Sequence, residues 1–234
     1  MILHAQDLTI GYSASRPVLQ HLAFSLPRQS LTCIIGDNGV GKSTLLRTIT
    51  GAIRPLRGSI FYALDDTPRT SLSAQQRARL FSVVLTDPIA DDYITIRDLV
   101  SMGRIPYTGF FGSLSDTDIS IVDSAIALMQ LQPIAGSRVS QVSDGQRQRA
   151  LIAKALAQQC PVMILDEPTA FLDYKSRIEL MKMLKDLALE GKSILVTTHD
   201  VDLARQFADW MWVVDDGRII QGTPQDCAVL LPSI

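Results

Sequence analysis

Residues 34–44, IIGDNGVGKST, combine three glycines, one lysine and two hydroxyl residues between two apolar runs. Positions 36–43, here called the phosphate loop, fit the spacing G-x-x-x-x-G-K-[ST], in which the backbone N–H groups of a glycine-rich turn surround phosphate oxygens. We predict that Lys42 contacts the β- and γ-phosphates of a nucleotide and that the Ser43 hydroxyl ligates Mg²⁺. The alternative is a glycine-rich turn with an incidental lysine. Phosphate binding is favoured because strand, spacing and helix agree.

Two carboxylates form a second candidate group. Asp166 and Glu167 directly follow the apolar run 162–165, at the predicted carboxyl end of a buried strand, where ligands bind in open α/β sheets. We expect Asp166 to hold Mg²⁺, usually through water, and Glu167 to orient and polarise the water that attacks the γ-phosphate. The alternative is a pair of turn carboxylates before Pro168. His199 follows the strand-like SILVTT and is a candidate hydrogen-bond donor to the γ-phosphate.

The elements that position these residues are predicted from apolar patterning. Strands are expected at 2–10, 18–26, 31–35 and 58–64, and a mostly helical section at about 72–158 with Ser73, Thr95 and Ser115 as N-caps. After it come PVMILDEP, a helix at about 175–190, the strand SILVTT, a short helix and a hairpin turning at Asp216-Gly217. Strands that alternate with helices at both ends of the chain predict a mostly parallel sheet with crossover helices.

Composition excludes several classes of protein. The 234 residues are 47% hydrophobic and carry a net charge of -2, so a partner held by many phosphate contacts, such as a nucleic acid, is not expected. The start of the chain lacks the pattern of a secretion signal, and no apolar segment is long enough to span a bilayer, which favours a cytoplasmic protein. Cys33, Cys160 and Cys227 lie far apart, as expected of reduced, packed thiols.

The stretch 142–173 identifies a family. Val142-Ser143-Asp144-Gly145-Gln146 resembles the LSGGQ signature of ATP-binding-cassette (ABC) proteins, and an arginine-bearing helix and DEP follow it. Leu172-Asp173 resembles the family's D-loop, His199 its switch histidine, and Tyr12 the aromatic residue that stacks on adenine. Ser143 and the Gly145 backbone at a helix N-terminus form a second anion site. In the family this site meets the ATP of a second copy.

The resemblance covers essentially the whole chain and implies its fold, activity and cofactors. The expected fold class is α/β: a P-loop NTPase in which a RecA-like core carries an antiparallel β subdomain and an α-helical subdomain at about 87–158, all in one domain over residues 1–234. The expected activity is ATP hydrolysis with Mg²⁺ in a head-to-tail homodimer that closes on two ATP molecules. The resemblance implies these nucleotide-binding residues: Tyr12, Gly36, Asn38, Gly39, Gly41, Lys42, Ser43, Thr44, Ser143, Gly145, Gln146 and Asp173.

The chain departs from the family pattern at two positions. Thr86 stands where the family has a glutamine that touches Mg²⁺. A threonine hydroxyl is shorter than a glutamine amide, so the metal contact either stays with Thr86, passes to water, or moves to Asp87. Asp144 stands where the signature has glycine. Because a carboxylate facing the γ-phosphate would be repulsive, we expect Asp144 to turn away and cap its helix.

The stretch TIRDLVSMGRIPYTGFFG, residues 95–112, indicates what the ATPase drives. Tyr107, Phe110 and Phe111 cluster there, and a partner or the interior of the helical subdomain covers them. The stretch resembles importers of ferric siderophores, haem and vitamin B12, whose membrane permease would contact residues around 86–112 and whose separate substrate-binding protein is an indirect partner. That places the chain on the cytoplasmic side of the inner (plasma) membrane. The alternatives are a soluble ABC ATPase without a permease and a P-loop kinase.

Overall fold

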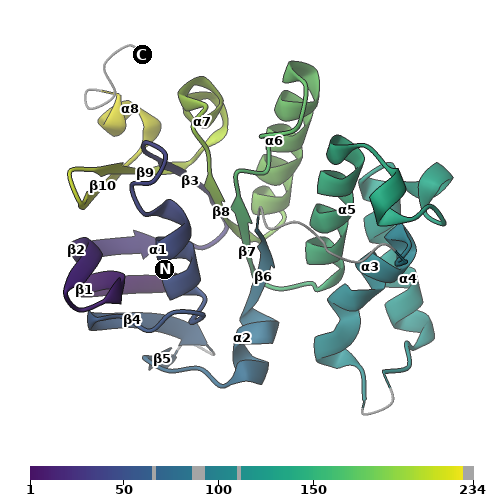
Figure 1. The fold of residues 1–234 in the computed structure, drawn as a ribbon, viewed down its shortest axis with the longest axis horizontal. Coiled ribbons are helices and arrows are strands. Elements are labelled where there is room, and N and C mark those ends of the chain that lie inside the picture. The colour runs from purple at the N-terminus through teal and green to yellow at the C-terminus, as the bar shows by residue number, and fades with distance from the viewer. Residues whose placement is uncertain (65–66, 86–92, 110–111, 229–234) are drawn as a thin grey trace.

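The computed structural model describes residues 1–64, 67–85, 93–109 and 112–228, and its centre is a six-stranded sheet (Figure 1). In spatial order the strands are β10 (Arg218–Gly222), β9 (Trp210–Asp215), β3 (Leu31–Ile35), β8 (Ser193–Thr197), β7 (Val162–Asp166) and β6 (Phe81–Val84). All neighbouring pairs are parallel except β9 and β10, which form an antiparallel hairpin. The predicted mostly parallel sheet is confirmed, and the carboxyl ends of β3, β7 and β8 share one edge.

A second sheet is built from the N-terminal part of the chain and is antiparallel where its register is defined. Its strands, in spatial order, are β2 (Arg16–Leu26), β1 (Leu3–Ser13), β4 (Arg57–Leu64) and β5 (Thr67–Arg69). The sequence predicts the three longer strands. It does not predict β5, because three residues are too few to show an alternating pattern.

The central sheet separates two apolar cores. Along β7, Val162 and Ile164 pack in the core shared with the N-terminal sheet, whereas Met163 and Leu165 pack in the core shared with the helices. Side chains alternate between the faces of a strand, so a strand buried on both faces is apolar at every position. This explains the continuous apolar runs in the sequence.

Eight α-helices and three short 3-10 helices are defined in the described part of the chain. They are α1 (Lys42–Ile49), α2 (Ala74–Leu80), α3 (Ile96–Ser101), η1 (Met102–Tyr107), α4 (Asp116–Leu128), η2 (Gln132–Ile134), η3 (Val139–Gln141), α5 (Asp144–Ala157), α6 (Tyr174–Leu189), α7 (Val201–Phe207) and α8 (Pro224–Cys227). Figure 1 shows α3, α4 and α5 grouped on one side of the central sheet and the N-terminal sheet on the other.

The predicted helix starts are confirmed. At each of them the hydroxyl accepts a hydrogen bond from the backbone N–H three residues later, and the side chain of that later residue accepts one in return. The pairs are Ser73–Gln76, Thr95–Asp98 and Ser115–Asp118.

The section predicted as mostly helical, 72–158, contains helices α2 to α5 and one strand that the sequence did not predict. This strand is β6, which pairs in parallel with β7 along the edge of the central sheet. Four residues are too few to show a period, and pairing with a distant strand decides their conformation.

Arg104 joins three parts of the helical region. Its Nε donates to Asp118 Oδ1 at 2.8 Å, its Nη1 donates to the Ala157 carbonyl at 2.8 Å, and its guanidinium lies 4.2 Å from the centre of the Tyr107 ring. Hydrogen bonds from the Ser115 hydroxyl and then from Arg104 lower the pKa of Asp118 to about 2. The Asp118 carboxylate therefore stays ionised at neutral pH, and the contacts of Arg104 tie η1 to α4 and to the end of α5.

The three cysteines are free and buried, as predicted. Among the described residues, no helix has both the length and the apolar character that crossing a bilayer requires.

Candidate active site

The phosphate loop connects β3 to α1, and its glycines are needed for steric reasons. Gly39 and Gly41 have φ angles of 83° and 113°, a region that residues with a Cβ rarely adopt. A Cβ on Gly41 would lie 2.6 Å from Val18 Cγ1, so the loop packs directly on β2. The glycines therefore allow the loop backbone to adopt these φ angles and to pack against β2.

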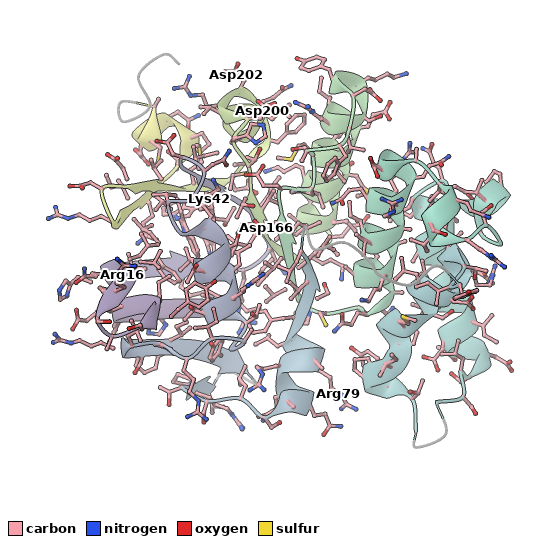
Figure 2. The ribbon with its side chains drawn as sticks, in the orientation of Figure 1. Arg16, Lys42, Arg79, Asp166, Asp200 and Asp202 are labelled. Atoms are coloured by element: carbon pink, nitrogen blue, oxygen red, sulfur yellow. The ribbon has the colours of Figure 1, made fainter. Side chains whose placement is uncertain are left out.

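Lys42 lies inside this loop and is only 6% exposed. Its Nζ donates to the carbonyls of Gly36 at 2.7 Å and Asp37 at 3.1 Å, and Glu167 Oε1 lies 3.8 Å away. Figure 2 shows Lys42 and Asp166 close to the same edge of the central sheet. A buried ammonium beside a helix N-terminus fits a phosphate anion, because both groups favour negative charge there.

Asp166 ends β7 and is hydrogen-bonded on both oxygens. Its Oδ2 accepts from the Ser43 hydroxyl at 2.7 Å and its Oδ1 from the Thr197 hydroxyl at 2.6 Å. A carboxylate and a hydroxyl next to a phosphate site are the oxygen ligands that Mg²⁺ uses in nucleotide-binding proteins. The donor set therefore fits Mg²⁺.

Glu167 follows at a sharp turn of the chain. Its φ of 49° is left-handed, and its backbone N–H donates to the Thr197 hydroxyl at 2.8 Å. Its Oε2 is hydrogen-bonded to His199 Nδ1 at 2.9 Å, whereas its Oε1 is buried and has no hydrogen-bond partner among the described residues. A carboxylate oxygen left free in a cleft is suited to accept a proton from a water molecule.

Thr197 is a site residue that the sequence analysis did not select. Its hydroxyl donates to Asp166 Oδ1 and accepts from the Glu167 N–H, so it fixes the orientation of both acidic residues. The available signal was a polar residue ending the apolar run SILVT, two positions before His199.

The structure thus brings Lys42, Ser43, Asp166, Glu167 and His199 together at the shared edge of β3, β7 and β8. A cleft of about 200 Å³ lies there. Its walls are Asn38, Gly39, Gly41, Lys42, Ser43, Thr44, Asp166 and Glu167.

The signature residues lie elsewhere in the same chain. Figure 1 shows α5, which starts after Ser143, on the other side of β6–β8 from α1. The Ser143 hydroxyl accepts from the Gln146 N–H at 3.3 Å, and Gln146 Oε1 accepts from the Ser143 N–H at 3.0 Å. Gly145 packs on the D-loop, since a Cβ there would lie 3.3 Å from Leu172 Cδ2.

The expectation that Asp144 caps α5 is wrong. Ser143 is the N-cap, and Asp144 is the first residue of the helix. The Asp144 carboxylate instead forms an ion pair with Arg147. The serine takes the cap because its short side chain reaches the N–H three residues later from a non-helical backbone.

Three further predicted residues lie apart from the cleft or outside the described chain. Tyr12 lies next to the last residue of β1 and is 68% exposed, beside β2, on which Gly41 packs. Asp173 is the N-cap of α6, and hydrogen bonds from the backbone N–H and hydroxyl of Ser176 lower the pKa of Asp173. Thr86, predicted as a metal ligand, lies outside the described residues, as does Asp87.

A phosphate loop, a strand-end acidic pair and a mostly parallel sheet define the class of P-loop nucleoside triphosphatases. The family model described as ABC transporter matches residues 19–170, and the chain belongs to that family. It is an ATP-binding, ATP-hydrolysing cassette, and the predicted fold class is confirmed.

The chain is similar to named transport proteins and to solved cassettes. The achromobactin transport ATP-binding protein of Dickeya dadantii is 37% identical over 224 residues, which are 95% of this chain and 82% of that protein. The cobalamin import ATP-binding protein of Halobacterium salinarum is 38% identical over 234 residues, 99% of this chain but 57% of that protein. An ATP-binding cassette, solved as a dimer in a post-hydrolysis state with ADP and Pi, is 25% identical with a TM-score of 0.83, covering 95% of this chain and 98% of that one.

Proposed function

We propose that this chain is the ATP-hydrolysing subunit of a membrane importer for an iron chelate, haem or cobalamin. The observation that carries the proposal is the cluster of Lys42, Asp166 and Glu167 on one sheet edge, in a chain similar to achromobactin and cobalamin transport proteins. A soluble ABC ATPase without a permease is the less favoured alternative. We assign residues 1–234 to one domain, with a helical subdomain at about 87–158.

Each site residue has a proposed role in hydrolysis. The Lys42 ammonium binds the β- and γ-phosphates, and Ser43 and Asp166 hold Mg²⁺, with Thr86 as a third proposed ligand. Mg²⁺ when bound neutralises phosphate charge that develops as the γ-phosphate leaves. Glu167 Oε1 takes up the proton of the attacking water. His199 donates from Nδ1 to Glu167 Oε2, and its proposed hydrogen bond to the γ-phosphate comes from Nε2, which requires a hydrogen on both ring nitrogens.

The partner on the nucleotide side is a second copy of the chain. Ser143, Gly145 and Gln146 lie at the N-terminus of α5, away from the phosphate loop of their own chain. In a head-to-tail dimer they reach the ATP of the other copy, and Asp173 lies at the same interface. The dimeric cassette with ADP and Pi supports this assembly.

The proposed permease-binding surface centres on η1. Ile105 is 64% exposed there, and Met102 and Tyr107 are also exposed. Phe110 and Phe111, named in the same prediction, lie outside the described residues. A permease on this surface places the chain on the cytoplasmic side of the inner (plasma) membrane, and a separate substrate-binding protein acts on the permease from the other side.

Replacing Ile105 by aspartate tests this surface. We expect the tagged wild-type chain to co-purify with a multispanning protein from detergent-extracted membranes. The amount of this protein that co-purifies with the Ile105→Asp variant should fall by at least about 90%, because the contact would desolvate the new charge. Ile220→Asp, at an exposed apolar position on β10, is the matched control and should retain the partner. If the wild-type chain retains no multispanning protein, the soluble alternative is favoured.

Tyr12→Ala should weaken nucleotide affinity about 5- to 30-fold with little change in turnover at saturating ATP. The reason is that stacking on the base stabilises ground and transition states equally. Tyr12→Phe keeps the ring and should bind as the wild type does. Fluorescent-nucleotide titration measures the affinity, and an unchanged affinity in Tyr12→Ala would mean that another group stacks on the base.

A further inference from the structure

Asp144 places a negative charge at the proposed second phosphate site. It is the first residue of α5, and its side chain is 64% exposed. Asp144 and Gly145 are the first two residues of α5, where backbone N–H groups have no partner within the helix. In the proposed dimer, this end of α5 meets the phosphates of the partner's ATP. A carboxylate and a phosphate would then compete for the same positive helix end.

Arg147, in the same helix, forms an ion pair with the Asp144 carboxylate. Its Nη1 lies 2.6 Å from Asp144 Oδ1, one turn further along α5. Its Nε also donates to the Val139 carbonyl at 3.4 Å, so the guanidinium lies between η3 and the carboxylate. Arg147 is 34% exposed, less than Asp144, and is the more constrained partner of the pair.

We propose that Arg147 is a positioning residue that draws the Asp144 carboxylate away from the first-turn N–H groups and neutralises it, so that the signature can accept the partner's nucleotide phosphate. The family pattern has glycine at position 144 and needs no such neutralisation, so Arg147 has this role because of Asp144. The inference rests on the proposed ATP-bridged dimer. It adds that the Asp144–Arg147 ion pair affects how readily this dimer closes.

A double-mutant cycle tests the proposal, with ATP-dependent dimerisation measured in a Glu167→Gln background that retains ATP. Arg147→Ala should weaken dimerisation at least about tenfold at low salt, because the unpaired carboxylate repels phosphate. Asp144→Gly should stay within about threefold of the parent. The variant Asp144→Gly with Arg147→Ala should return to within about threefold, because the charge that needed neutralising is gone. Arg147→Lys keeps a positive charge and should lose less than Arg147→Ala.

Two further measurements, the salt dependence of dimerisation and nucleotide binding by the monomer, distinguish neutralisation of Asp144 from a purely structural role of Arg147 and from an effect on the phosphate loop. The Arg147→Ala defect should shrink as salt is raised from 50 to 500 mM, since screening weakens repulsion between exposed charges. Binding of a fluorescent ATP analogue to the monomer, which depends on the phosphate loop and Tyr12 but not on α5, should be unchanged in every variant.

Three results would overturn the inference. A double variant as defective as Arg147→Ala would show that Arg147 supports the helix or contacts phosphate itself. Arg147→Ala that dimerises like the parent would show that the pair does nothing for closure. A parent that binds ATP but never dimerises would contradict a dimer that forms without the permease, and the inference with it; in the first two cases the dimer would stand.

Discussion

Lys42→Ala should lower ATP hydrolysis by at least about 10³-fold and weaken ATP binding strongly. The Lys42 ammonium is buried, and its described partners are two loop carbonyls and, 3.8 Å away, Glu167. Its removal leaves the triphosphate charge uncompensated where little water can replace it, and takes away the ammonium that lies 3.8 Å from Glu167 Oε1. Phosphate release measures the rate, and nucleotide titration measures the affinity.

Lys175→Ala is the matched control for this variant, because it removes an ammonium that is 87% exposed on α6. It should hydrolyse ATP like the wild type. Thermal unfolding of Lys42→Ala with and without ATP separates a binding defect from a folding defect: the variant should fold but gain little stability from ATP, whereas the wild type is stabilised by its ligand. Wild-type hydrolysis in Lys42→Ala would remove Lys42 from the site.

Glu167→Gln should separate binding from chemistry. The amide keeps the size of the side chain but cannot take up a proton, so ATP should bind while hydrolysis falls about 10²- to 10⁴-fold. In the structure, Glu167 Oε1 is buried and has no hydrogen-bond partner among the described residues, so it is the oxygen that can accept the proton of water. Glu167 Oε2 is hydrogen-bonded to His199. Glu190→Gln, at an exposed position after α6, is the control and should be unaffected.

The same variant tests assembly. If each ATP joins the phosphate loop of one copy to Ser143 of the other, unhydrolysed ATP should hold the dimer together by mass action. On a sizing column, Glu167→Gln should run as a dimer with ATP and shift towards monomer with ADP. Hydrolysis at the wild-type rate would exclude Glu167 as the catalytic base. An inactive variant that stays monomeric in saturating ATP would leave the chemistry in place and contradict a dimer that forms without the permease.

Features that depend on residues close in the chain could be predicted from the sequence. The helix starts at Ser73, Thr95 and Ser115 need only a hydroxyl and an acceptor three residues later. The Asp216-Gly217 turn needs two residues that tolerate positive φ, and both have it. The phosphate loop is likewise a local feature, because its glycine spacing and its lysine lie within eight residues. Each of these features joins residues close in sequence, so its pattern can be recognised without knowing how the rest of the chain folds.

Features that depend on which strands and helices are neighbours were decided by the tertiary structure alone. Thr197 orients Asp166 and Glu167 because β8 lies beside β7, a pairing of residues about thirty positions apart that no local pattern specifies. Residues of β6, within a largely helical section, form a strand because they pair in parallel with β7. The N-cap of α5 also depends on the folded backbone. Both Ser143 and Asp144 are residue types that can cap a helix, but Ser143 has the extended backbone conformation of an N-cap. Asp144 is the first helical residue and forms an ion pair with Arg147 instead.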